Sequence, residues 1–164
     1  MGKSTVAKAL ANRFGRAIHL DIDSFRLMVV KGIALPMPGN WNEETARQFD
    51  LAHIAAGQTA NVYASAGFAV IAEHASHTPY IQSFLAHSGS AIVVSLTADL
   101  STNQARNSAR TSDSFDYEGL GFVIQMLNET MPEEHRTAGF PVLDTTNNSV
   151  EETVDQILKL SDER

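Results

Sequence analysis

The first residues of the chain that could carry chemistry are Gly2, Lys3, Ser4 and Thr5, which read GKST and run directly into an amphipathic segment. This tetrapeptide is the second half of the pattern G-x-x-x-x-G-K-[ST], in which a loop and a helix N-terminus hold the phosphates of a nucleotide. The glycine lets the backbone approach the phosphates, the lysine reaches the β- and γ-phosphates, and the serine hydroxyl is a ligand of Mg²⁺. The sequence therefore predicts that these four residues contribute to a site for ATP and Mg²⁺.

The same four letters could also occur by chance. The first glycine of the motif and the buried strand that should precede it are not in the chain, because only Met1 stands before Gly2. If the motif is genuine, the first strand of the sheet is expected to be missing from this chain. The remaining sequence has to decide between the two interpretations.

Two carboxylates and one cation follow the first predicted strand. Asp21 and Asp23 lie in the sequence LDIDSF, at the end of the segment 17–21. The carboxyl ends of the strands border the ligand crevice in a doubly wound sheet, so both carboxylates could contact a substrate. They could equally be turn and N-cap carboxylates before a helix that begins at Ser24. Arg26 could bind an anionic or polar acceptor, or it could be a solvated surface arginine.

Further candidate side chains follow the second predicted strand or lie on a later helix. His74 and His77 form an H-x-x-H pattern, which offers too few ligands for zinc. We interpret them as loop histidines that could line an acceptor pocket, His74 above all. Arg106 and Arg110 are four residues apart and share one helix face, either at a ligand or as an ordinary basic surface. Three aromatic residues are expected in the core rather than in a stacking platform: Trp41, Phe49 and Tyr63.

Short runs rich in Val and Ile alternate with longer helical patterns, which is typical of a parallel sheet covered by helices on both faces. The sequences FAVIAE and AIVVSL are nearly continuous hydrophobic runs, so the second and third strands are expected in the interior of the sheet. The last helix is expected to begin with a capping box formed by Ser149 and Glu152. The predicted strands are 17–21, 68–73, 91–96 and 141–144, and the predicted helices are 4–13, 42–65, 101–110 and 150–160.

Composition limits the class of protein. Of the 164 residues 43% are hydrophobic and 19% are charged, as expected of one domain that covers 1–164. The formal net charge of −7 disfavours a nucleic-acid partner, whose phosphates are bound by clustered Lys and Arg. No apolar run approaches the roughly 20 residues of a membrane span and no signal-peptide pattern is found, so no membrane partner and a cytoplasmic location are expected. The absence of Cys excludes disulfides and thiolate metal sites.

Five segments follow one another along the chain: GKSTVAKALANRF, IHLDIDSFR, GFAVIAEHA, ARNSAR and FPVLDTTNNSVEETVDQILKL. Together they resemble the P-loop kinases of the nucleoside-monophosphate-kinase-like group, in order and over nearly the whole chain. The resemblance is strongest to the chloramphenicol phosphotransferase family, with gluconate kinases and zeta toxins as looser relatives. It implies the three-layer αβα sandwich of P-loop NTPases with strand order 2-3-1-4-5, in which the missing first strand would be the central one.

The resemblance implies roles for the residues after the first two strands. Asp23 would be the general base that accepts the proton of the acceptor hydroxyl, and Asp21 would contact the substrate or support the base. Glu73 ends a loose Walker B pattern and, with Ser4, would bind Mg²⁺, the glutamate through water. Glu73 could also be a satisfied strand-end carboxylate.

The resemblance also implies roles for residues in the second half of the chain. A segment at about 99–120 would be a lid, whose arginines Arg106 and Arg110 would neutralise charge on the transferring phosphate. Thr145 and Asn147 in the loop TTNNS would flank the adenine. The alternative for this loop is a polar turn followed by a helix cap.

These expectations favour an ATP-dependent phosphotransferase that moves the γ-phosphate to a hydroxyl of a small molecule such as a sugar, an antibiotic or a nucleoside, as a monomer or homodimer. A nucleoside monophosphate kinase is the alternative enzyme, although it would need more acceptor-side arginines than Arg26 and Arg47 provide. A nucleotide-binding protein without turnover is the third candidate, because half of the phosphate loop is absent.

Overall fold

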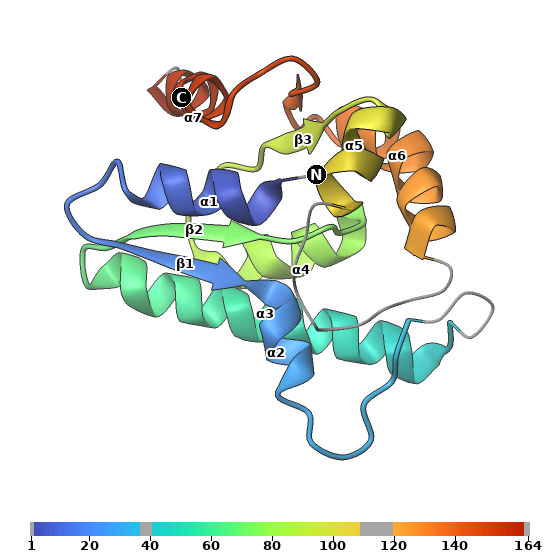
Figure 1. The fold of residues 1–164 in the computed structure, drawn as a ribbon. Coiled ribbons are helices and arrows are strands. Elements are labelled where there is room, and N and C mark those ends of the chain that lie inside the picture. The colour runs from blue at the N-terminus through green and yellow to red at the C-terminus, as the bar shows by residue number, and fades with distance from the viewer. Residues whose placement is uncertain (1, 37–40, 109–119, 163–164) are drawn as a thin grey trace. The chain divides into compact units, whose positions relative to one another are not determined.

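The computed structural model describes residues 2–36, 41–108 and 120–162 (Figure 1). These residues fall into two compact units, an N-terminal unit of Lys3–Ile92 and a C-terminal unit of Val93–Arg164 together with the first two residues. Within the described ranges no helix is both long enough and apolar enough to cross a membrane. The elements are α1 (Lys3–Ala11), β1 (Ala17–Asp21), α2 (Ile22–Leu27), α3 (Glu43–Ser65), β2 (Ala69–Glu73), α4 (Thr78–Ser88), β3 (Ser95–Thr97), α5 (Leu100–Ser108), α6 (Leu120–Thr137), β4 (Val142–Asp144) and α7 (Val150–Asp162).

The N-terminal unit is built on a parallel pair of strands, β1 and β2, in which Ala17 faces Ala69 and Asp21 faces Glu73. Helix α1 lies on one face of this pair and α3 on the other (Figure 1). Because both strands run in the same direction, their carboxyl ends lie together, and the residues that follow Asp21 and Glu73 share one edge of the sheet.

Helix α3 is the long support of this unit. It begins where the Asn42 side chain accepts a hydrogen bond from the Thr45 amide at 3.0 Å, a standard N-cap. Its buried face carries small residues, among them Ala52 and Ala56, which pack with Ile22 of α2 into one hydrophobic cluster. Gly57 on the same helix lies against the backbone of α4, so the two helices approach closely.

The C-terminal unit contains a second parallel pair, in which Ser95 of β3 faces Val142 of β4 and Thr97 faces Asp144. Helices α5 and α6 pack on one another, and α6 contacts both strands. The capping box predicted for the last helix is confirmed, because Ser149 and Glu152 each donate a backbone amide to the other's side chain, at 2.8 and 3.1 Å.

The predicted third strand, 91–96, is wrong in its extent. Only Ser95–Thr97 is a strand, and Ile92 is 42% exposed. The expected position of the second strand in the sheet interior is also wrong, because every residue of β2 is only partly buried. Each sheet of the described residues has only two strands, so β2 has one neighbouring strand and lies at a sheet edge. Residues 91–94 belong to neither sheet, because no described strand pairs with them.

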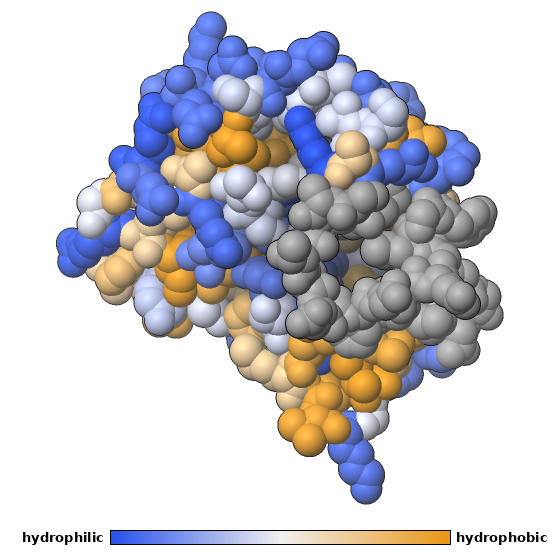
Figure 2. Space-filling view, viewed as in Figure 1, coloured by the Kyte–Doolittle hydropathy of each residue, from blue (hydrophilic) through white to orange (hydrophobic). Residues whose placement is uncertain are grey.

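The segment after α2 leaves large hydrophobic side chains in contact with solvent. Leu27, Met28 and Val30 are 51%, 68% and 99% exposed. The space-filling view shows orange surface at its lower edge, where α2 and the following loop lie in Figure 1 (Figure 2). An exposed apolar surface of this kind is a feature of binding faces, although single exposed side chains are common on any protein.

Candidate active site

Ser4 and Glu73, the two predicted Mg²⁺ ligands, lie in direct contact in the N-terminal unit. The Ser4 hydroxyl, in the first turn of α1, donates a hydrogen bond of 2.5 Å to Glu73 Oε1 at the end of β2. The Glu73 side chain is 11% exposed, and His19 Nε2 lies 3.8 Å from the same oxygen. The contact joins residues 69 positions apart, and it places a hydroxyl and a carboxylate together at the end of the sheet.

Helix α1 begins inside the GKST sequence. Gly2 has φ of +70°, a left-handed conformation that glycine adopts readily, and Lys3 is the first residue of the helix. Thr5 is exposed. A hydroxyl and a carboxylate at a helix N-terminus are the oxygen ligands that suit Mg²⁺, which takes its remaining ligands from water and phosphate. The described residues contain no cluster of three or more His, Cys, Asp or Glu that could hold a metal alone. The oxygen donors of Ser4 and Glu73 are therefore of the kind that suits Mg²⁺, and the binding of the metal and of a nucleotide stays a prediction.

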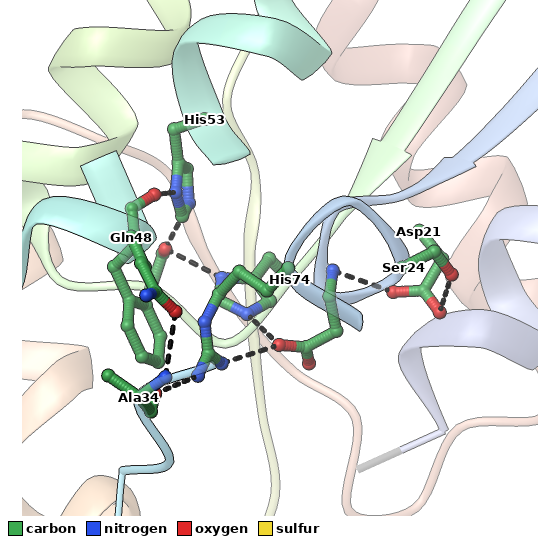
Figure 3. A network of polar contacts seen from close by, with 10 residues as sticks. Asp21, Ser24, Ala34, Gln48, His53 and His74 are labelled. Atoms are coloured by element: carbon green, nitrogen blue, oxygen red, sulfur yellow. Dashed lines mark hydrogen bonds and ion pairs between the residues drawn. The ribbon is translucent and has the colours of Figure 1, made fainter. Parts of the chain in front are cut away.

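Asp21 is the N-cap of α2. Its carboxylate accepts hydrogen bonds from the Asp23 amide and from the Ser24 hydroxyl, both at 3.1 Å (Figure 3). Helix α2 begins at Ile22, two residues before the predicted start. The structural interpretation of Asp21 as a capping carboxylate is therefore correct, and a contact with substrate stays a prediction.

Asp23 lies in the first turn of α2, and 52% of its side chain is exposed. Its Oδ1 atom accepts a hydrogen bond from His74 Nε2 at 2.9 Å and lies 3.5 Å from Arg26 Nη1 (Figure 3). Partial burial raises the pKa of this carboxyl, but the His74 hydrogen bond and the nearby charges of His74, Arg26 and Lys3 outweigh burial and leave its pKa below the ordinary value. Asp23 is thus an ionised carboxylate at neutral pH, as a general base requires.

His74 connects Asp23 to the interior of the unit. The side chain is 5% exposed, and its Nδ1 atom lies 2.8 Å from the Ser76 hydroxyl. The same hydroxyl lies 2.5 Å from Nε2 of His53, which is buried on α3. His53 Nδ1 in turn donates to the Phe49 carbonyl at 2.7 Å. Burial lowers the pKa of His53 to about 4, so this imidazole is neutral at pH 7.

Arg26 is buried and is not the solvated surface arginine that the sequence allowed. The residue is 6% exposed, its guanidinium lies 3.8 Å from the centre of the Phe49 ring, and Nη2 donates to the Ala34 carbonyl at 3.1 Å. Gln48 binds the same loop, accepting from the Ala34 amide and donating to the Gly32 carbonyl. The surface interpretation fails because the stacked guanidinium is held over an aromatic ring on α3.

Aromatic rings gather beside these groups. Trp41 lies 5.0 Å from Phe49 and 6.5 Å from Tyr80, measured between ring centres. Tyr80 also stacks on His53 at 5.6 Å. The expectation that Trp41 and Tyr63 are core residues is wrong, because they are 52% and 38% exposed. Trp41 therefore contacts the rings of Phe49 and Tyr80 while about half of its surface stays exposed.

The residues predicted in the second half of the chain lie in the C-terminal unit. Arg106 donates to the Thr145 hydroxyl at 3.1 Å and to the Thr145 carbonyl at 2.9 Å, which ties α5 to the loop after β4. Asn147 is exposed in this loop. Arg106, which was predicted in the lid, is therefore in contact with Thr145, which was predicted at the adenine. Arg110 lies outside the described residues, and so does the part of the predicted lid from 109 to 119.

Two participants were missed by sequence reasoning, His53 and Ser76. His53 falls on the Ala-rich buried face of α3, together with Ala52, Ala56 and Ala60. A histidine in such a stripe must find a hydrogen-bond partner, because an unpaired polar group is costly in a core. That rule signals a partner for His53 but does not identify Ser76, which lies 23 positions away.

Comparison with solved structures finds the same fold in a sugar kinase from Janibacter sp. HTCC2649. Its unliganded crystal structure matches 98% of this chain and 88% of its own, with a TM-score of 0.66 and 20% identity. A putative kinase from Chloroflexus aurantiacus J-10-fl matches 96% of this chain and 91% of its own, with a TM-score of 0.51 and 16% identity. No family model and no curated protein sequence matches the chain. The two structures establish the α/β fold.

Proposed function

We propose that this protein is an ATP-dependent phosphotransferase that transfers the γ-phosphate to a hydroxyl group of a small molecule. The proposal depends on two hydrogen bonds at the carboxyl ends of β1 and β2, one between Ser4 and Glu73 and one between Asp23 and His74. Glu73 and His74 are adjacent in sequence, so the two contacts are made by neighbouring residues at the end of β2. A fold shared with two structures named as kinases supports the proposal.

In this proposal each residue has a separate task. The Lys3 ammonium would bind the β- and γ-phosphates at the start of α1, while Ser4 and Glu73 would hold Mg²⁺, the glutamate through water. Asp23 would accept the proton of the acceptor hydroxyl as its O–H bond breaks. The oxygen of the acceptor would then bond to the γ-phosphorus of ATP while the bond from that phosphorus to the ADP oxygen breaks. Arg106 and the loop of Thr145 lie in the C-terminal unit, and the roles proposed for them follow from the sequence alone: charge neutralisation on the transferring phosphate for Arg106 and contact with the adenine for the loop.

The proposal includes the P-loop assignment of GKST. Gly2 would then be the second glycine of a Walker A motif.

The acceptor-side arginines favour an uncharged acceptor over a nucleoside monophosphate. Arg26 is buried against Phe49 and donates to the Ala34 carbonyl. Arg47 contacts the Glu44 carboxylate through two nitrogens, at 2.7 and 2.8 Å. Both guanidinium groups are engaged in the N-terminal unit, so a phosphate on the acceptor would have to displace these contacts.

A transfer assay tests the proposal. The protein expressed from its full open reading frame is incubated with γ-labelled ATP, Mg²⁺ and a panel of sugars, nucleosides and other small alcohols, and labelled product is measured. We expect transfer to at least one alcohol, and we expect Lys3→Ala to abolish it while the circular dichroism spectrum stays unchanged. Lys8→Ala, on the exposed side of the same helix, is the matched control and should stay active. ATP binding without transfer to any acceptor would favour a nucleotide-binding protein instead.

A further inference from the structure

Aromatic side chains from four segments of the N-terminal unit form one continuous cluster. Trp41, just before α3, lies 5.0 Å from Phe49 of that helix and 6.5 Å from Tyr80 of α4, measured between ring centres. Phe49 lies 5.6 Å from Tyr80 and 5.9 Å from His74, which follows β2. Rings at these separations are in contact, so the cluster runs without interruption from Trp41 to His74.

One end of this cluster lies at the proposed base, Asp23. His74 Nε2 lies 2.9 Å from Asp23 Oδ1. Arg26 also joins the cluster to the base, because its guanidinium carbon lies 3.8 Å from the centre of the Phe49 ring and its Nη1 atom lies 3.5 Å from Asp23 Oδ1. Along this second route one guanidinium and one ring separate the carboxylate from the Trp41 indole, which is a distance that a small molecule can bridge.

Trp41 is the exposed member of the cluster. It is 52% exposed, whereas the other three rings are partly buried. A single exposed apolar side chain is common on any protein. Trp41 differs because it continues a packed set of rings that ends at a carboxylate and a guanidinium, and aromatic surface with a few polar groups is typical of small-molecule sites. Tryptophan also presents a large contact area and loses little conformational freedom when a ligand covers it.

We propose that the exposed surface of Trp41 is the acceptor subsite of this protein, and that the acceptor is a cyclic alcohol whose flat ring face packs on the indole. This inference rests on the proposed function and narrows the class of acceptor within it. One hydroxyl group of the acceptor then lies at Asp23, which takes up its proton, while the ring displaces water from the Trp41 surface.

Ring geometry distinguishes the expected acceptors from open-chain polyols. A ring is rigid, so it covers the indole with little loss of conformational freedom, whereas an open chain must order several rotatable bonds to cover the same area. The C–H groups of a sugar ring and the π-face of a nucleobase both offer a flat surface to an aromatic side chain. Sugars and nucleosides share this chemistry, and separate arms of a binding experiment distinguish them.

Fluorescence gives the first test, because Trp41 is the single tryptophan of the chain. Tryptophan emission is titrated with three ring alcohols, methyl glucoside, myo-inositol and uridine, and with two open-chain alcohols, sorbitol and glycerol. Mg²⁺ and a non-hydrolysable ATP analogue are present, so that the nucleotide site is occupied. We expect a saturable change of emission with at least one ring alcohol and none with the open-chain alcohols.

The arms of this titration identify the class of ring. A saturable change with methyl glucoside or myo-inositol and none with uridine would assign the subsite to sugars, and the reverse result would assign it to nucleosides. No saturable change with any ring alcohol, or an equal change with sorbitol, would overturn the proposal.

Transfer kinetics give the second test. Trp41→Ala removes the ring surface and leaves Asp23 in place, so we expect the KM for the acceptor to rise about 10-fold or more, as the loss of a stacking partner typically costs. The KM for ATP and kcat should change little, and Trp41→Phe, which keeps a ring, should lie between. Tyr63→Ala is the matched control, because Tyr63 is also an exposed aromatic residue but packs on Phe68 near the other end of α3.

The outcomes separate the subsite from the proposed function. An unchanged acceptor KM in a folded Trp41→Ala protein would mean that Trp41 only packs on α3, and it would overturn the subsite while the phosphotransferase stands. Transfer to sorbitol as efficient as transfer to any ring alcohol would do the same. If Trp41→Ala does not fold, Trp41→Leu, which keeps an apolar side chain without a ring, takes its place with the same expected rise. If no alcohol accepts phosphate, the proposed function fails, and the fluorescence titration alone decides whether Trp41 binds ring alcohols.

Discussion

At the scale of single residues, Asp21 and Asp23 lie two positions apart but have different partners. Asp21 binds the amide of Asp23 and the hydroxyl of Ser24, both at the start of α2, whereas Asp23 binds His74 from the next strand end. A sequence pattern can place both at the end of a strand, because a carboxylate after a buried run is a local feature. It could not place His74 on Asp23, because that contact spans 51 positions.

Asp23→Asn should lower kcat by roughly 10²–10⁴-fold, the usual contribution of a positioned acid or base. Asparagine has nearly the same shape but cannot take a proton, so the KM for ATP should change little. Steady-state transfer kinetics measure both constants. Asp21→Asn is the comparison variant and should lower kcat less than Asp23→Asn does, because asparagine caps helices as well as aspartate. A dead Asp21→Asn with an active Asp23→Asn would reverse the assignment of the base.

The pair of Ser4 and Glu73 predicts a dependence on Mg²⁺. Glu73→Gln keeps a hydrogen-bond partner for Ser4 but removes the negative charge, so the Mg²⁺ concentration that gives half-maximal transfer should rise. A titration of activity with MgCl₂ at fixed ATP measures this shift. Glu44→Gln, on the exposed start of α3, should titrate as the wild type does. Equal Mg²⁺ requirements in wild type and Glu73→Gln would remove Glu73 from the metal site.

At the scale of elements, the features that depend on nearby residues were predicted better than the features that depend on a neighbouring strand. The capping box of Ser149 and Glu152 is correct because both partners lie three residues apart and need no other part of the chain. Strand β1 is correct at both ends. The run 91–96 was overextended because a hydrophobic sequence can form a strand only where a neighbouring strand offers hydrogen bonds, and composition does not report neighbours.

The close approach of α3 and α4 predicts that Gly57→Ala destabilises the protein. A Cβ atom at this position would lie 2.6 Å from the Phe84 carbonyl oxygen and 3.0 Å from His87 Cβ, so backbone would have to shift. Overpacking of this kind costs about 1–3 kcal/mol, more than the gain of about 1 kcal/mol from replacing glycine within a helix. Urea unfolding measures the difference.

Gly15→Ala is the matched control for Gly57→Ala. A Cβ atom at Gly15 would meet no heavy atom within 4 Å, and the residue has no positive φ. The substitution should therefore be neutral or slightly stabilising, because alanine restricts the unfolded chain more than glycine does. A Gly57→Ala protein as stable as wild type would mean that α4 can move away from α3 at little cost.

At the scale of the whole molecule, the alternation of strand and helix patterns predicted the fold class. Parallel pairing of β1 with β2 and of β3 with β4 agrees with that class. The division of the described residues into two units was not predicted, because it depends on which strands pair. The buried polar chain from His53 to Asp23 was not predicted either, although it links two helices and two strand ends. Its consequence for the whole molecule is a dependence of stability on pH.

Burial lowers the pKa of His53 from 6.5 to about 4, so the unfolded protein binds a proton at this residue more readily than the folded protein. The contribution of the neutral His53 to the free energy of unfolding is complete above pH 6.5 and is lost as the pH falls toward 4. Between pH 7.5 and pH 5 the loss should be about 2 kcal/mol. Urea unfolding of the wild type and of His53→Gln at these two pH values measures the part of the pH dependence that comes from His53, because glutamine does not titrate.

The decrease in unfolding free energy between the two pH values should therefore be smaller in His53→Gln by about this amount, whatever the stability of the variant at pH 7.5. Gly57→Ala controls for destabilisation alone, since it removes no titratable group and should show the wild-type decrease. An identical decrease in His53→Gln and wild type would mean that the pKa of His53 is the same in the folded and the unfolded protein, and that burial does not lower it.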